Sequence, residues 1–340
     1  MIHGHGDDGY RYGRPISINF SSNVYGRFDW GALHQHLSQS LALIHSYPEP
    51  AAESLVALLA QKECISPESI CVTNGATEAI YLIAQAFAGK KSSIIIPTFS
   101  EYADACVLHQ HQMKYAFSLH EAVSEQTDLL WLCHPNNPTG LAYDQDELEH
   151  AIKRHPNTLF VIDQSYEHFT QHPLFSVSGA LTYPNVMVLH SMTKHYAIPG
   201  LRLGYMTASA DLLRKVTCYC MPWAVNQLAI EAGKYLLNHH HDYTIDLDTL
   251  LIETKQLQKQ LETIEGITVY PTDTHFFLVC LAKYKAAHLK NYLANEFGFL
   301  IRDAANFAGL NEYYLRIATQ NKHENNQLIQ AIKQWQSSHS

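Results

Sequence analysis

The sequence has few charged residues and no cluster of basic ones. Lys, Arg, Asp and Glu make up 16% of the 340 residues, against roughly 25% in typical soluble proteins. The formal net charge is -9, and we find no run of Lys and Arg of the kind that binds nucleic acid. The composition therefore argues against a nucleic-acid partner and favours a small-molecule ligand.

Signals for membranes and export are also missing. No uninterrupted apolar stretch approaches the roughly 18 residues that cross a bilayer. The N-terminus reads MIHGHGDDGYRYG, which lacks the basic segment and following apolar segment of a secretory signal. We expect a cytoplasmic protein with no membrane partner.

Cysteine spacing shows no zinc or disulfide pattern, whereas histidine is abundant. The 7 cysteines are scattered without Cys-x-x-Cys pairs, so we expect reduced and mostly packed thiols. The 22 histidines include the strings HQH (109–111) and NHHHD (238–242), which fall at the ends of predicted helices. We interpret them as solvated helix ends and predict no metal site, with a ligand role as the alternative.

Short apolar runs alternate with helical patterns in the middle of the chain. The runs SICVT, SSIIIP, DLLWLC, TLFVI and NVMVLH are rich in Ile, Leu and Val. Continuous apolar strands between helices predict an α/β domain whose mostly parallel sheet is covered on both faces. We place this large domain at residues 46–238. Residues 239–340 mix strands and helices as a smaller α+β domain would, and residues 1–45 are predicted to pack into it.

Polar residues follow several of these strands, where ligands of open α/β sheets collect. Gly75 allows a tight turn whose next N–H groups open a helix and can bind an anion, although an ordinary turn is the alternative. The string HPNNPTG (134–140) fixes a rigid turn from which Asn amides can donate into a cleft. Asp163 ends a buried strand, where a carboxylate is costly without a cation or a donor; capping a helix is the alternative.

The string SMTKHYAIPGLRLGY (191–205) gathers hydroxyls, an amine and a guanidinium between two strands. Ser191, Thr193 and Arg202 suit a phosphate, and a desolvated Lys194 amine suits a Schiff base. A solvated loop lysine is the other interpretation of Lys194, and the residues alone leave both open.

Together, the strings HPNNPTG, DQSY and SMTKHYAIPGLRLGY resemble the aspartate aminotransferase superfamily, the fold-type I enzymes that use pyridoxal phosphate. The likeness runs from about Tyr47 to Arg316. It implies an aspartate-aminotransferase-like large domain, a smaller domain, pyridoxal 5'-phosphate as cofactor and a homodimer. A non-catalytic ligand sensor with this fold is the alternative class, and the presence of both Lys194 and Asp163 argues against it.

The resemblance also implies roles for the residues of the matching strings. Lys194 would form the Schiff base with the cofactor and act as acid and base at the substrate Cα, and Asp163 would pair with the pyridine nitrogen. The other implied contacts are Tyr166 and Asn137 with the phenolic oxygen, Gly75, Ala76, Thr77, Ser191 and Arg202 with the phosphate, Tyr102 stacked on the ring, and Tyr47 reaching the cofactor phosphate of the neighbouring subunit.

Substrate residues follow from the resemblance as well. Arg316 matches the arginine that binds the substrate α-carboxylate, Arg302 is placed to meet a substrate phosphate, and Asn23 and His5 are further candidates for the cleft. The strings YPEP and FLIRDAANFAGLNEYYLRIA resemble histidinol-phosphate aminotransferases and, more closely, the threonine-phosphate decarboxylases of cobalamin biosynthesis. This implies decarboxylation of a phosphorylated amino acid or amino alcohol, or alternatively amino-group transfer to 2-oxoglutarate. The same residues serve both reactions, so the motifs do not choose between them.

Overall fold

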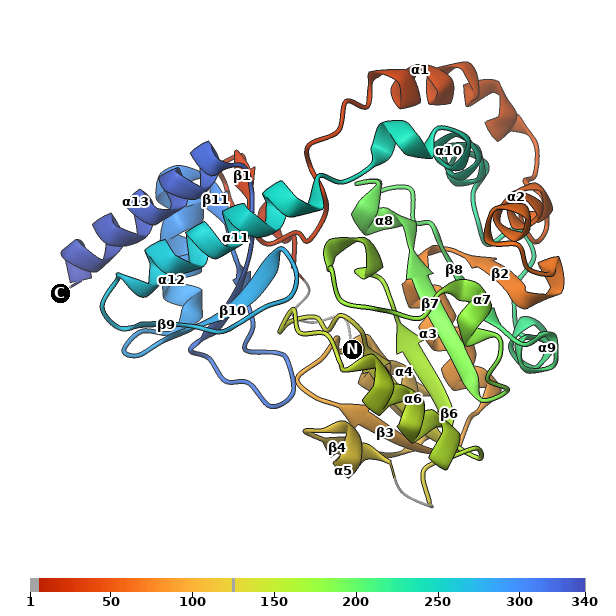
Figure 1. Cartoon of the computed structure of the whole chain (residues 1–340). Coiled ribbons are helices and arrows are strands. Elements are labelled where there is room, and N and C mark those ends of the chain that lie inside the picture. The colour runs from red at the N-terminus through yellow and green to blue at the C-terminus, as the bar shows by residue number, and fades with distance from the viewer. Residues whose placement is uncertain (1–5, 124–125, 340) are drawn as a thin grey trace.

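The predicted apolar runs form strands of a seven-stranded sheet, with SICVT at its edge, in the computed structural model, which describes residues 6–123 and 126–339. Strand β8 runs antiparallel to both of its neighbours, whereas the strands from β7 to β4 run parallel (Figure 1). The predicted mostly parallel sheet is therefore confirmed. The strand order is β2 (Ile70–Thr73), β8 (Gly204–Ala208), β7 (Val186–Ser191), β6 (Leu159–Asp163), β5 (Leu129–Cys133), β3 (Lys91–Ile95) and β4 (Gln112–Ala116).

Helices bury both faces of this sheet, which explains why its central strands are apolar throughout. In β5, Leu129 and Trp131 pack into one core cluster with helices on one face, while Leu130 and Leu132 pack into another cluster on the opposite face. The first face carries α3 (Gly75–Ala86), α4 (Glu101–Leu108) and α9 (Ala210–Thr217), and the second carries α5 (Leu119–Ala122), α6 (Gln145–Arg154) and α7 (Val177–Ala180).

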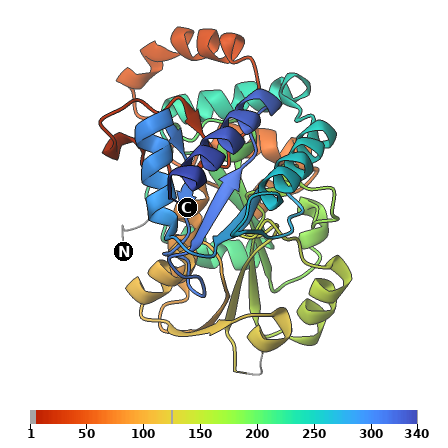
Figure 2. The same ribbon diagram turned by 90° about the vertical axis from the view of Figure 1, so that its left-hand side faces the viewer.

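A smaller α+β unit follows the large sheet, as predicted. Its four strands are antiparallel, in the order β12 (Arg302–Asp303), β13 (Tyr314–Ala318), β10 (Phe276–Leu281) and β9 (Ile267–Val269). Figures 1 and 2 show three helices packed over this sheet, and residues of all three share one apolar cluster with it. These helices are α11 (Leu247–Glu262), α12 (Ala286–Tyr292) and α13 (Lys322–His339).

The N-terminal segment contacts both units. Strand β1 (Ile18–Asn19) pairs in parallel with β11 (Phe299–Leu300) of the smaller unit. Helix α1 (Gly31–Gln39), however, lies along α10 (Gln227–Asn238), where Leu33 joins an apolar cluster with residues of α10 and α2 (Glu53–Glu63). The apolar side of α1 thus packs on the larger unit, and the division at residues 46 and 238 stays a prediction.

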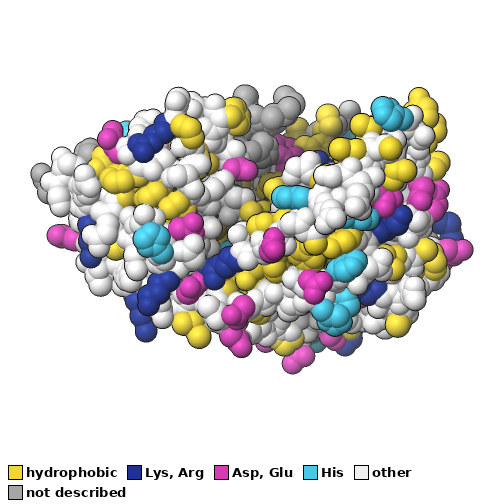
Figure 3. All heavy atoms as spheres, turned by 90° about the horizontal axis from the view of Figure 1, so that it is seen from above, with side chains coloured by type: hydrophobic (Ala, Val, Ile, Leu, Met, Phe, Trp, Pro, Cys, Tyr) yellow, Lys and Arg dark blue, Asp and Glu magenta, His cyan; other side chains and the backbone are white. Residues whose placement is uncertain are grey.

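The surface carries charges of both signs. On the face seen in Figure 3, Lys and Arg are interspersed with Asp and Glu, and several histidines are exposed. Within residues 6–123 and 126–339, no helix is long and apolar enough to cross a bilayer, and no group of His, Cys, Asp and Glu is arranged to hold a metal ion.

Candidate active site

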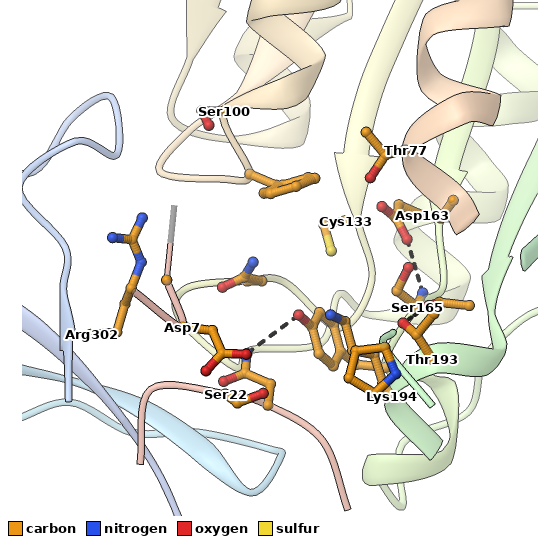
Figure 4. A pocket seen from close by; sticks show the side chains of 18 of the residues that line it. Asp7, Ser22, Thr77, Ser100, Cys133, Asp163, Ser165, Thr193, Lys194 and Arg302 are labelled. Carbon is orange, nitrogen blue, oxygen red and sulfur yellow. Dashed lines mark hydrogen bonds between the residues drawn. The ribbon is translucent and has the colours of Figure 1, made fainter. Parts of the chain in front are cut away.

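A cavity lies between the two units, beyond the carboxyl ends of β5, β6 and β7. The N-terminus of α3 forms one wall, the smaller sheet forms another, and residues 6–23 contribute a third (Figure 4). Of the residues predicted from the sequence, those lining the cavity are Asn23, Ala76, Thr77, Tyr102, Asn137, Asp163, Tyr166, Ser191, Lys194, Arg202, Arg302 and Arg316.

Asp163 is a buried carboxylate whose oxygens accept hydrogen bonds. Oδ1 accepts from the Ser165 N–H at 2.9 Å, and Oδ2 accepts from the Tyr102 hydroxyl at 2.7 Å. Burial, with the nearby Asp163 charge, raises the pKa of Tyr102 well above its usual value, so this hydroxyl remains a donor. The Tyr102 ring stacks on Trp131, with ring centroids 5.9 Å apart. Its predicted stacking on a cofactor stays a prediction.

Lys194 lies on the short helix α8 (Met192–His195), directly after β7, and lines the same cavity. Burial, helped by the positive charges of Arg316 and Arg202, lowers the pKa of Lys194 to about 8. Both causes disfavour the ammonium form. The site therefore holds a lysine amine that is partly neutral near physiological pH, which is the form that attacks carbonyls.

The turn after β2 forms a cradle for an anion. Gly75 has φ +77°, and a Cβ there would lie 2.6 Å from Arg202 Nη2, so only glycine lets the guanidinium approach the N-terminus of α3. Ser191 and Thr193 share a hydrogen bond of 2.8 Å beside it. A helix N-terminus, a guanidinium and two hydroxyls converge here, and this donor set fits a phosphate.

The smaller sheet supplies two arginines from neighbouring strands. Arg302 on β12 and Arg316 on β13 are direct cross-strand partners, and both side chains are buried at the cavity. Burial lowers the pKa of each to about 10, which leaves both charged at neutral pH. Arg302 Nη2 donates to Asn306 at 2.7 Å, and its guanidinium lies 5.2 Å from the Phe307 ring centroid. This wall suits a molecule with two negative groups.

Several polar atoms around Arg316 lack protein partners. Its Nη atoms donate to Asn137 Oδ1 and, at 2.5 Å, to the carbonyl of Ser21, but Nε is buried without an acceptor among the described residues. Asn23 donates to the Tyr166 hydroxyl at 3.3 Å, and its own Oδ1 is likewise orphaned. Because buried polar groups normally have partners, these atoms indicate a site that is completed by a polar ligand.

Sequence comparison agrees with this geometry. The family model for aminotransferases of class I and II matches residues 15–332. The chain belongs to this family. Its members are enzymes that depend on pyridoxal phosphate, and the lysine, buried carboxylate and phosphate cradle described above fit that cofactor.

Two kinds of enzyme recur among the relatives of this aminotransferase-family chain. It is 29% identical to threonine-phosphate decarboxylase of Salmonella typhimurium over 93% of this chain and 90% of that one. It is 32% identical to histidinol-phosphate aminotransferase of a Thermoanaerobacter species, covering 86% and 84% of the two chains. The crystal structure of L-threonine-O-3-phosphate decarboxylase from Porphyromonas gingivalis matches with a TM-score of 0.92 and 40% identity, over 94% of this chain and 99% of that one.

Two of the predicted site residues are not placed at the cavity. One lies on the surface away from it, and the other lies outside the described residues. Tyr47 is 82% exposed and stacks on Trp223, with ring centroids 5.0 Å apart. His5 lies outside the described residues, so its predicted place in the cleft stays a prediction. Gly75 contributes through its backbone and its contact with Arg202.

The sequence did not predict that residues near the N-terminus, besides His5 and Asn23, line the active-site cavity. Gly6, Asp7 and Ser21 line the cavity, and a Cβ on Gly6 would lie 3.0 Å from Cδ of Arg302. The only signal is the glycine-rich, acidic string HGHGDDG, which carries no strand or helix pattern. Its role becomes visible only once the fold brings it against Arg302.

A buried ion pair anchors this segment to the smaller unit. Lys290 Nζ on α12 lies 2.7 Å from both carboxylate oxygens of Asp8, and both side chains are at most 10% exposed. The Tyr12 hydroxyl adds a bond of 2.9 Å to Asn291. Residues 6–12 are thus tied to α12 while their glycine end lies against Arg302.

Replacing Lys290 with methionine is expected to lower the free energy of unfolding by about 3 kcal/mol, because it leaves the buried Asp8 carboxylate without the ammonium group that bonds to both of its oxygens. Urea unfolding followed by circular dichroism would measure the change. Lys285→Met is the matched control, since Lys285 and Glu312 form an exposed pair 3.6 Å apart on the same unit and should contribute less than about 1 kcal/mol. Equal effects of the two substitutions would contradict the assigned importance of the Asp8 anchor.

Proposed function

We propose that this protein is a pyridoxal-phosphate-dependent decarboxylase of a phosphorylated amino acid, with threonine phosphate as the favoured substrate. The observation that carries the proposal is the pair Arg302 and Arg316, side by side on β12 and β13 and facing the cavity of Lys194 and Asp163. Two buried cations match a substrate with both a carboxylate and a phosphate. A plain amino acid has one negative group and could engage only one of the two guanidinium groups.

The protein residues would hold the cofactor at both ends. Gly75, Ala76, Thr77, Ser191 and Arg202 would bind its phosphate, since their donors converge at the N-terminus of α3. Asp163 would keep the pyridine nitrogen protonated, with Tyr166 and Asn137 near the phenolic oxygen. When bound, pyridoxal phosphate supplies an electron sink for the bond that breaks at the substrate Cα.

Lys194 and the arginines would then control where a bond breaks. Arg316 would hold the substrate carboxylate and Arg302 its phosphate, which fixes the rotation of the substrate about the bond between its nitrogen and Cα. After the carboxylate leaves as carbon dioxide, the ammonium form of Lys194 would deliver a proton to Cα and become the neutral amine, an exchange for which a pKa of about 8 is well matched. Burial also raises the pKa of Tyr166, so its hydroxyl stays protonated throughout.

The similarity to the Porphyromonas gingivalis decarboxylase, at 40% identity over nearly the whole chain, supports decarboxylation. A second candidate, a histidinol-phosphate aminotransferase, is supported by curated relatives up to 32% identical. Both readings place a substrate phosphate at Arg302.

The exposed apolar residues around Tyr47 support a homodimer, which we place in the cytoplasm. Leu41, Ile44, Tyr47, Met221 and Trp223 are large, exposed and apolar, and all five lie within residues 41–47 or 221–223. Such a patch marks a protein interface more often than bare surface. Tyr47 would cross this interface and reach the cofactor phosphate of the partner subunit.

The two reactions are separated by their products. Incubation with threonine phosphate alone should release carbon dioxide without any keto acid, and histidinol phosphate with 2-oxoglutarate should yield little glutamate. Rapid glutamate formation without carbon dioxide release would instead establish the aminotransferase. A purified protein that never binds pyridoxal phosphate, seen as the absence of its absorbance band, would refute both.

The pH dependence of Lys194 gives a test that needs no substrate. In cofactor-free protein, attachment of pyridoxal phosphate to Lys194, fixed by borohydride and quantified by peptide mapping, should rise with pH, reach half of its maximum near pH 8 and level off above about pH 9. The protonated amine is unreactive, and a pKa of about 8 instead of 10.5 makes the neutral amine roughly 300-fold more abundant at pH 7. Exposed Lys215 is the internal control, whose labelling at pH 7 should stay far below that of Lys194.

A further inference from the structure

Two cysteines outside the active site lie close together at the edge of the large sheet. Cys71 is on β2, and Cys220 is in the loop between α9 and α10; their Sγ atoms are 3.8 Å apart. They are 149 positions apart in the sequence, so the fold alone brings them together. Neither is needed for the chemistry proposed above.

The pair is accessible and chemically unequal. Both side chains are partly exposed and line one apolar hollow with Val225 and with Met221, which also belongs to the proposed dimer face. The two thiols share a hydrogen bond in which either sulfur can donate; with Cys71 as the donor, this bond lowers the pKa of Cys220. Cys220 is therefore the better nucleophile, because the thiolate is the reactive form.

We propose that Cys71 and Cys220 form an oxidation site that closes to a disulfide when the protein meets hydrogen peroxide. The Sγ atoms must approach by about 2 Å to reach the bond length of ~2.05 Å. Cys220 lies beyond the last residue of α9, Thr217, in a loop without regular structure, so side-chain rotation and a small loop shift suffice. This inference does not depend on the proposed decarboxylase function.

The chemistry balances with peroxide as the only co-reactant. The Cys220 thiolate attacks one peroxide oxygen and the O–O bond breaks, which leaves a sulfenic acid on Cys220 and a hydroxide that takes a proton to become water. The Cys71 sulfur then attacks the Cys220 sulfur, the S–O bond breaks, and the oxygen leaves with the Cys71 proton as a second water. Two thiols lose two electrons in total, and one peroxide gains them.

The bridge would tether a loop that touches the predicted dimer face. Trp223 is three residues beyond Cys220, has φ +64°, donates its N–H to the Pro50 carbonyl at 2.9 Å and stacks on Tyr47. A disulfide would join this loop to β2, whose other end leads into Gly75.

Oxidation is therefore expected to shift the fluorescence of Trp223, and a reductant should reverse the shift. A Trp223→Phe variant, in which the shift should be absent, identifies its source.

The decisive test is peptide mapping of the full-length protein as purified with its cofactor, after peroxide treatment and alkylation. We expect a peptide pair linked through Cys71 and Cys220, lighter by two hydrogens and released by dithiothreitol. Exposed Cys64 is the internal control and should stay free of disulfide. Cys71→Ala should also slow alkylation of Cys220 by iodoacetamide at pH 7 several-fold, since the donor to its sulfur is removed. If both cysteines are still alkylated while Cys64 is oxidised, or if Cys220 links to Cys218, the proposal is wrong.

Discussion

Replacing Lys194 with alanine is expected to reduce carbon dioxide release from threonine phosphate by at least about 10³-fold, because one side chain both anchors the cofactor and moves the proton at Cα. The cofactor should still bind through the phosphate cradle of Gly75 and Arg202, but borohydride should no longer fix it to the protein. Spectroscopy, borohydride trapping and assay of carbon dioxide release together measure the three consequences.

The matched control for this variant is Lys215→Ala, which removes an exposed lysine on α9. It should leave turnover and cofactor attachment unchanged. If Lys194→Ala kept a tenth or more of the activity, or if borohydride trapped the cofactor on another lysine of the unmodified enzyme, the assignment of Lys194 would be abandoned.

Replacing Arg302 with alanine is expected to lower kcat/KM for threonine phosphate about 100-fold, while plain threonine, already a poor substrate, should lose less than about threefold. Hydrogen bonds to charged groups contribute about 1.5–3 kcal/mol each, and Arg302 can offer two to a phosphate. The substrate carboxylate would still meet Arg316. Steady-state kinetics with both substrates, and the inhibition constant of inorganic phosphate, would measure the difference.

Two controls belong to the Arg302 experiment. Arg302→Lys keeps the charge but not the planar fork, so it should recover part of the loss for the phosphorylated substrate. Arg154→Ala removes an exposed arginine at the end of α6 and should have no effect on either substrate. Equal losses of kcat/KM for threonine phosphate and for threonine in Arg302→Ala would show that Arg302 does not bind the substrate phosphate.

The main sheet and the polar residues at its edge could be predicted because both follow from local patterns. The strands β5, β6 and β7 are apolar on both faces, and parallel strands place their carboxyl ends together, so Asn137, Asp163 and Lys194 had to lie near one another. The apolar pattern did not predict that β8 runs antiparallel to its neighbours. Its string GYMTA is as apolar as its neighbours, and direction leaves no mark on composition.

Contacts between distant parts of the chain escaped prediction for a different reason. Asp8 and Lys290 are separated by 282 positions, and each looks like an ordinary surface charge in its own segment. The pairing of Cys71 with Cys220 is hidden in the same way, since neither lies in a recognisable spacing. The position of Tyr47 relative to the active site depends on a second copy of the chain, which no pattern within one copy can specify.

The bond from Arg316 to the Ser21 carbonyl joins residues 295 positions apart, and the cavity needs both. During protein synthesis the larger sheet is finished once residue 208 has emerged, long before β13 exists. A partly synthesised chain could therefore bind the cofactor at Lys194, but it would still lack Arg302 and Arg316, which are proposed to bind the substrate. The arginine side of the site would therefore be complete only after almost the whole chain has left the ribosome.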